Sequence, residues 1–582
     1  MQRLRPGEMR AVLLVAAAVM AVTLLPYIAA LRIAPPGDVF SGFIWGIDDG
    51  NVYLSWIRQA SEGHVLLANQ YATDPQNPHF FNVFLLMAGL LCRVSGLAPI
   101  YVFHALRIVG GVFMLGAFYW LVSLLTRDRY VRWASLGLAA LGSGLGWVVV
   151  ALEEAGVHVG LRPVDVGIGW QTQPEAVTFV SALLNPLFIT SMGLICLTLG
   201  HALRAVEENR LRSAALAGVL LLVLGNIHSY DIFAVHLALG TWLVYGVLTR
   251  RYELGPVAFI YAVIFLIGLP APLWSYWAAH QDPSYLMKAW TLTLSAGFIN
   301  YVVAYGLLVV FGAIGAWAAF RRRRRTFDAD DLGEYVPPDL MKFALFWALA
   351  NSVVPALPVS FQRKLVEGLH MPVAILAGVG VVYLARLLTR RAAEDGRTQT
   401  VKERMVLTVV GAIVLCLPSN ALFVSQCLGH VKTNNEQLLH VLAPPIYLSA
   451  DYAEAVGWLE RNAGEKEVVL SSSLIGNHIP AAAGCTVYVG HWAETLHFAR
   501  KLGKVAEFFS PVTGVERRLD VLWGDVRASY VVYGPYERLI GQSTRWGIGY
   551  GDGAGIDLEA ATGGALRRVF ETGDVEVYEV DM

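Results

Sequence analysis

The stretch AVLLVAAAVMAVTLLPYIAALRI at residues 11–33 is followed closely by GIDDG at residues 46–50. The first stretch is long enough to cross the hydrocarbon core of a membrane, which needs about 20 apolar residues. The second places two adjacent carboxylates, Asp48 and Asp49, just past the end of that apolar segment. Ionisable groups near hydrocarbon are costly, so this position indicates chemistry or ion binding.

The composition predicts a polytopic membrane protein. Of 582 residues, 56% are hydrophobic and 15% charged, and the mean hydropathy is +0.52. The net charge of −1 indicates no class of partner. The abundance of Ala, Gly, Val and Arg suggests a bacterium, with the protein in its inner membrane. The five cysteines form no disulfide framework, although a pair between Cys427 and Cys485 is conceivable.

Apolar segments recur along the chain and predict about eleven membrane-spanning helices. The fifth and sixth are separated only by residues 226–230, so they are alternatively one broken or re-entrant unit. The segments lie near residues 11–33, 99–126, 132–152, 179–203, 211–225, 231–249, 255–279, 299–320, 341–358, 371–389 and 406–428.

The distribution of Lys and Arg predicts the orientation, because these residues concentrate in cytoplasmic loops. A cytoplasmic N-terminus satisfies this rule in each successive loop. The arginine run at residues 321–325 is then a cytoplasmic anchor on anionic headgroups and not a nucleic-acid patch. We therefore expect no nucleic-acid partner.

The long first loop, the loop at 153–178 and the C-terminal segment are predicted to lie outside the cytoplasm. The first loop, 34–98, contains amphipathic stretches at 52–60 and 80–94 that predict interfacial helices. The loop at 153–178 holds Arg162, Asp165, Trp170 and Glu175.

The chain is expected to divide into a membrane domain, residues 1–429, and a small extracytoplasmic α/β domain, residues 430–582. Alternating residues at 467–470 and 486–489 predict strands in the second domain, and residues 451–461 predict a helix.

Asp48 and Asp49 are the first candidate site residues. A raised pKa in one of two adjacent carboxylates near lipid would suit a general base. Alternatively, the pair binds a divalent cation, or merely caps a helix and solvates a loop.

The second candidate is FQRK at residues 361–364, followed by Glu367 and His370. Arg363 and Lys364 lie where the positive-inside rule disfavours cations, and a phosphate ligand would explain them. The alternative is that both side chains snorkel to headgroups.

Further candidate substrate contacts are grouped around polar breaks in the sequence. Residues 228–231 fit a helix-end cap as well as they fit a site that contacts substrate. GNHIP at 476–480 and GHWAET at 490–495 fit structural turns as well as they fit substrate contacts. Asn185 and Asn351 are expected to be packing or kink positions. The candidate contacts are His228, Tyr230, Asp231, Gln362, Glu367, His370, His491 and Glu494.

This arrangement resembles the GT-C glycosyltransferases over nearly the whole chain. More narrowly, it is similar to the bacterial dolichyl-phosphate-mannose–protein mannosyltransferase and aminoarabinose-transferase-like members, and the tail resembles those of uncharacterised GT-C-like proteins. Asp48 and Asp49 match the family's acidic motif in the first loop, and Arg363 with Lys364 match its cations that bind lipid phosphate. The Trp-Trp-Asp motif of oligosaccharyltransferases is absent from the sequence, which argues against that branch.

The resemblance implies that a sugar moves from a polyprenyl-phosphate donor to a glycan, lipid or protein acceptor on the outer face. One of the two aspartates would be the general base, and Arg363 and Lys364 would stabilise the leaving phosphate. A transporter or flippase of lipid-linked glycans is the main alternative, although the candidate groups gather at one face and no internal repeat is evident. An inactive GT-C-like scaffold is the third possibility.

Overall fold

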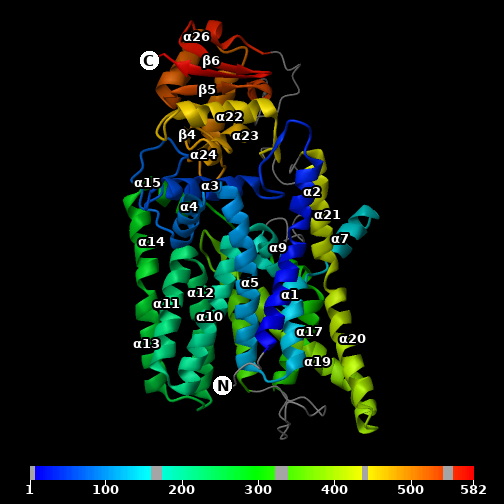
Figure 1. Ribbon diagram of the computed structural model, residues 1–582. Helices are drawn as coiled ribbons and strands as arrows, with labels where there is room; N and C mark the ends of the chain where they lie inside the picture. Colours follow the sequence, from blue (N-terminus) through cyan, green and yellow to red (C-terminus); the bar gives the residue numbers. More distant parts are fainter. Residues whose placement is uncertain (1–6, 159–172, 321–338, 435–443, 542–554, 582) are drawn as a thin grey trace. The chain divides into compact units, whose positions relative to one another are not determined.

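The computed structural model describes residues 7–158, 173–320, 339–434, 444–541 and 555–581 (Figure 1). Arg162, Asp165, Trp170 and the arginine run at 321–325 lie outside these ranges. The chain divides into two compact units. The first, the helical unit, comprises Met1–Leu24, His104–Ser275 and Leu292–Gln426, and the second, the mixed unit, comprises Leu25–Phe103, Tyr276–Thr291 and Cys427–Met582.

The helical unit is built from apolar helices, as the sequence predicts. Within the described residues, six helices are long and apolar enough to cross a membrane, or nine when each bent pair counts as one span. The helices that lie wholly or largely in this unit are α1 (Glu8–Val22), α5 (Pro99–Leu125), α6 (Arg129–Leu141), α7 (Gly146–Glu154), α9 (Thr178–Leu184), α10 (Pro186–Glu208), α11 (Leu211–Ile227), α12 (Asp231–Leu248), α13 (Leu254–Gly268), α16 (Phe298–Tyr305), α17 (Leu307–Phe320), α18 (Lys342–Val353), α19 (His370–Glu394), α20 (Thr398–Leu415) and α21 (Pro418–Thr433). Helix α14 (Pro270–Gln281) is divided between the two units.

Each of the eleven predicted segments falls on a helix or a bent pair, and two of these helices have fewer than 18 residues. The segment at 211–225 is α11, with 17 residues, and that at 341–358 is α18, with 12 residues. A short 3-10 turn containing Pro355 follows α18, and proline cannot continue a helical hydrogen-bond ladder. The segments before and after residues 226–230 are two separate helices, α11 and α12, and not one broken unit.

Helices α17 and α19 pack closely because glycines face each other. A Cβ atom on Gly315 would lie 1.9 Å from the Leu376 carbonyl oxygen, and one on Gly380 would lie 2.0 Å from that of Phe311. Small residues at such positions let two backbones approach each other, as is common in membrane helices.

The mixed unit joins the first loop to the C-terminal segment. The unit begins with α2 (Leu25–Ile33), the end of the first apolar segment, and the loop contributes α3 (Ile47–Glu62) and α4 (Val83–Ser95). Residues 52–60 and most of 80–94 are therefore helical, and the place of these helices at the membrane interface stays a prediction. Strand β1 (Val39–Phe40) pairs antiparallel with β2 (Tyr447–Leu448), which links the two segments through the backbone.

The C-terminal segment is the predicted α/β structure. Its sheet has the order β4-β3-β5-β7-β6, in which β3 runs parallel to β4 and β5 while β7 runs antiparallel to β5 and β6 (Figure 1). Phe508, Val531 and Tyr578 belong to its apolar core. The strands are β3 (Val468–Leu470), β4 (Thr486–Val487), β5 (Tyr530–Tyr533), β6 (Leu566–Thr572) and β7 (Val575–Val580), and the helices are α22 (Ala450–Asn462), α23 (Ser473–Gly476), α24 (Ile479–Ala482), α25 (Phe498–Phe509), α26 (Val515–Leu519), α27 (Pro535–Gly541) and α28 (Leu558–Ala561).

The cysteines are free thiols, and the conceivable pair between Cys427 and Cys485 is wrong. All five are buried. Each behaves as a small apolar core residue, which is the usual environment of a free cysteine.

Candidate active site

Asp48 and Asp49 lie in the first turn of α3. The chain enters this helix through Gly46, whose φ of 62° is in the left-handed region that favours glycine. The exposed amide groups and the dipole at a helix N-terminus stabilise negative charge there. The Asp48 side chain is 23% exposed and that of Asp49 is 67% exposed. The Asp49 carboxylate is therefore accessible at the surface of the protein and is not buried in a low-dielectric interior.

His491 contacts both aspartates from the C-terminal segment of the same unit. Its Nε2 atom lies 3.2 Å from Asp49 Oδ1 and 3.6 Å from Asp48 Oδ2. The backbone N–H groups of Ala493 and Glu494 are 3.1 and 3.2 Å from Nδ1, which accepts them. The neutral ring therefore carries its proton on Nε2 and donates it to Asp49.

A buried amide network fixes the start of α3. The Asn51 side-chain amide donates to Asn477 Oδ1 at 2.7 Å and to His478 Nδ1 at 3.2 Å. The Asn477 amide donates to the Asp48 carbonyl oxygen at 3.4 Å. Burial lowers the pKa of His478 to about 4, so the ring is neutral near pH 7. Part of the predicted GNHIP turn thus positions the aspartates.

Glu494 forms an ion pair with Lys288, and both residues belong to the mixed unit. The Lys288 Nζ atom also lies 4.7 Å from the centre of the Trp56 ring, a cation–π contact. Lys288 and Asn51 were not candidates in the sequence. A signal existed for Lys288, because it is one of the few cations in the segments that the positive-inside rule assigns to the outside.

Arg363 lies in the helical unit, in a 3-10 turn at Gln362–Val366. Its Nε atom is 3.8 Å from Glu175 Oε1, and Glu175 is buried in the turn at Pro174–Ala176. Burial raises the pKa of Glu175, and the charge of Arg363 opposes this rise. The Lys364 Nζ atom lies 4.8 Å above the ring of Tyr230. The Arg363 guanidinium is therefore directed at a buried carboxylate, a partner that the sequence did not suggest.

Three further candidates of the helical unit come together in one cluster. The His228 Nδ1 atom lies 3.0 Å from Asp231 Oδ1 and 3.3 Å from Glu367 Oε2. We call His228, Asp231 and Glu367 the His228 cluster.

Gln362 and His370 have structural contacts in the described part of the chain. The Gln362 amide donates to the Leu357 carbonyl oxygen at 2.8 Å. His370 Nδ1 lies 2.9 Å from the Thr178 hydroxyl, and its ring stacks on that of Tyr305. Their contact with a substrate stays a prediction.

Comparisons with known proteins identify the fold. No family model matches the sequence, and no curated protein matches it. The structure resembles the apo oligosaccharyltransferase of Archaeoglobus fulgidus with a TM-score of 0.55 and 12% identity, over 92% of this chain and 70% of that chain. ArnT of Cupriavidus metallidurans, solved with undecaprenyl phosphate, gives a TM-score of 0.48 and 14% identity, over 96% of this chain and 97% of that chain.

The protein therefore has the fold of the GT-C membrane glycosyltransferases. This confirms the resemblance inferred from the first loop, the apolar helices and the α/β tail. At this level of identity the comparison establishes the fold and leaves the reaction to be argued from the residues.

Proposed function

We propose that this protein is a membrane glycosyltransferase that moves a sugar from a polyprenyl-phosphate donor to an acceptor hydroxyl. The observation that carries the proposal is the arrangement of Asp48, Asp49 and His491. It supplies an accessible carboxylate on a rigid helix terminus, held by a buried imidazole. The shared fold with an oligosaccharyltransferase supports the same reaction class.

Asp49 is the proposed general base, with Asp48 and His491 as positioning residues. Asp49 takes the proton of the acceptor hydroxyl while the acceptor oxygen attacks the anomeric carbon. The bond between that carbon and the phosphate oxygen breaks, and the phosphate leaves with the electron pair. A single displacement inverts the anomeric configuration. His491 keeps the Asp49 carboxylate oriented, because its own ring is fixed by two backbone N–H groups.

Arg363 and Lys364 are the proposed ligands of the donor phosphate. A guanidinium can bind two phosphate oxygens at once, and the nearby ammonium adds a second positive charge. Glu175 would orient Arg363 before the donor binds. We place the first loop and the C-terminal segment on the extracytoplasmic side of a bacterial inner membrane, where a lipid-linked donor arrives by lateral diffusion.

The experiment that tests this function follows the fate of the donor. Purified protein in nanodiscs is incubated with undecaprenyl-phosphate-linked sugars and native envelope glycans, and free undecaprenyl phosphate is measured by mass spectrometry. The proposal expects release that depends on both the protein and the acceptor. A flippase would instead move intact donor between the leaflets of a liposome without cleaving it, and that result would overturn the proposal.

A further inference from the structure

The His228 cluster brings an imidazole and two carboxylates together from distant parts of the sequence. His228 and Asp231 flank the short link between α11 and α12, and Asp231 is the first residue of α12. Glu367 lies between the 3-10 turn at Gln362–Val366 and α19. Asp231 is 1% exposed and Glu367 is 0% exposed.

Five buried side-chain atoms of this cluster lack hydrogen bonds within the described part of the chain. This holds for His228 Nδ1, for both carboxylate oxygens of Asp231 and for both of Glu367. Two buried carboxylates repel each other, and a buried charge is costly unless it is paired or bound to a metal. One Nδ1–H group can serve only one of the two carboxylates.

The spacing of the three groups is that of metal ligands. One ligand atom from each residue lies within 4.8 Å of the other two, and the two distances to His228 Nδ1 are 3.0 and 3.3 Å. Nitrogen and oxygen ligands lie about 2.0–2.2 Å from zinc, which places two ligands about 3.3–3.5 Å apart in a tetrahedral site. The corresponding separation at an octahedral metal is about 3.0 Å.

We propose that His228, Asp231 and Glu367 bind one divalent first-row transition metal ion. An imidazole nitrogen with two carboxylates favours Zn²⁺ or Mn²⁺ over Mg²⁺ or Ca²⁺, which prefer all-oxygen sites. Three protein ligands leave a coordination position open, as in catalytic metal sites. The metal neutralises both buried carboxylates and holds the link between α11 and α12 against the start of α19.

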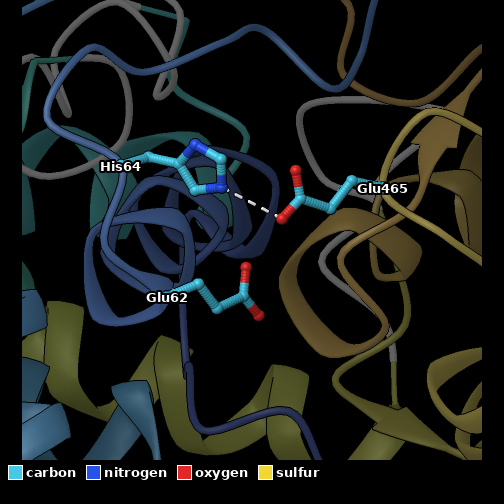
Figure 2. A group of neighbouring side chains, drawn as sticks. All are labelled: Glu62, His64 and Glu465. Atoms are coloured by element: carbon cyan, nitrogen blue, oxygen red, sulfur yellow. Dashed lines mark hydrogen bonds and ion pairs between the residues drawn. The ribbon is translucent and has the colours of Figure 1, made fainter.

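A second group of one histidine and two glutamates is exposed and already paired, unlike the His228 cluster. Glu62, His64 and Glu465 lie near one another in the mixed unit (Figure 2). All three are exposed, and the group is already engaged in surface ion pairs. His64 pairs with Glu465 at 3.0 Å, and Glu62 pairs with Arg58 at 3.0 Å. This group provides a matched control.

The test uses the full-length protein in nanodiscs, stripped with a chelator and then loaded with Zn²⁺ or Mn²⁺. We expect about one ion per chain by elemental analysis, a rise in the unfolding temperature on loading, and weak competition from Mg²⁺. Glu367→Gln and Asp231→Asn should each weaken binding by at least about tenfold and abolish that rise, whereas His64→Ala should change neither.

Co²⁺ gives a readout that does not depend on activity. Its visible absorption bands report nitrogen and oxygen ligands, and they should shift or disappear in His228→Ala. If a variant fails to fold, a chelator titration of the wild-type protein replaces it and should lower the unfolding temperature. The inference is overturned if the wild-type protein takes up no metal, or if Glu367→Gln binds Zn²⁺ as tightly as wild type. Neither result bears on sugar transfer, so the proposed function is tested separately.

Discussion

Replacing His491 separates its two structural tasks, because each ring nitrogen has its own partner. In His491→Phe, the N–H groups of Ala493 and Glu494 lose their acceptor. A buried unsatisfied donor costs about 1–3 kcal/mol, and the Ala493 N–H is only partly buried, so we expect a loss of about 2–4 kcal/mol. In His491→Asn, the side-chain oxygen can still accept these N–H groups, and only the bond to Asp49 is lost. Because the Asp49 side chain is 67% exposed, that loss should be about 0.5–1 kcal/mol.

Thermal unfolding of the full-length protein in detergent, followed by intrinsic fluorescence, measures the difference. A change of 1 kcal/mol shifts the unfolding temperature by about 2–4 °C in a domain of 150–250 residues. We therefore expect a fall of about 4 °C or more for His491→Phe and of about 2 °C for His491→Asn. Equal losses for the two variants, or no loss for His491→Phe, would refute the assignment of the Nδ1 contacts.

The remaining predictions concern the cations, the buried histidine and the helix contact. Arg363→Ala should weaken binding of undecaprenyl phosphate by about 1.5–3 kcal/mol, with partial recovery in Arg363→Lys, when microscale thermophoresis measures affinity. If Arg363→Ala combined with Glu175→Gln restores both stability and binding, Arg363 serves only to pair Glu175. The pKa of His478 is lowered to about 4, so the folded state binds fewer protons than the unfolded state, whose imidazole has a pKa of about 6.5. The free energy of unfolding should therefore fall by about 3 kcal/mol as the pH is lowered from about 6.5 to about 4. In His478→Gln this part of the pH dependence should be absent. Gly380→Ala should destabilise by at least about 1–3 kcal/mol, because its Cβ would lie 2.0 Å from a carbonyl oxygen. Gly411→Ala, which meets no atom within 4 Å, should be neutral or stabilising in the same thermal assay.

Local patterns were sufficient to predict the helices and the strands of the tail. Apolar runs marked the helices, and alternating residues marked β3 and β4. The same patterns did not show where some of these helices end or bend. A run of apolar residues does not show that α18 ends before Pro355, nor that a 90° bend separates α16 from α17.

The candidate site depended on contacts that no local pattern reveals. Asp48 and Asp49 stood out because they follow an apolar segment. Their support by Asn477 and His491 joins parts of the chain that are far apart in sequence, and so does the contact of Arg363 with Glu175. The polar link at residues 228–231 looked like a helix cap because Glu367, the third member of the His228 cluster, comes from another helix end.

Donor turnover by a variant with both Asp48→Asn and Asp49→Asn tests the proposed reaction most directly. The asparagines keep the size of both side chains but cannot accept a proton from the acceptor. Glu62→Gln, which removes an acid at the other end of α3, is the matched control. The rate of undecaprenyl phosphate release in nanodiscs should fall by about 10²–10⁴-fold in the double variant and stay at the wild-type level in the control. Release at the wild-type rate by a folded double variant would contradict the role of these aspartates as the catalytic base.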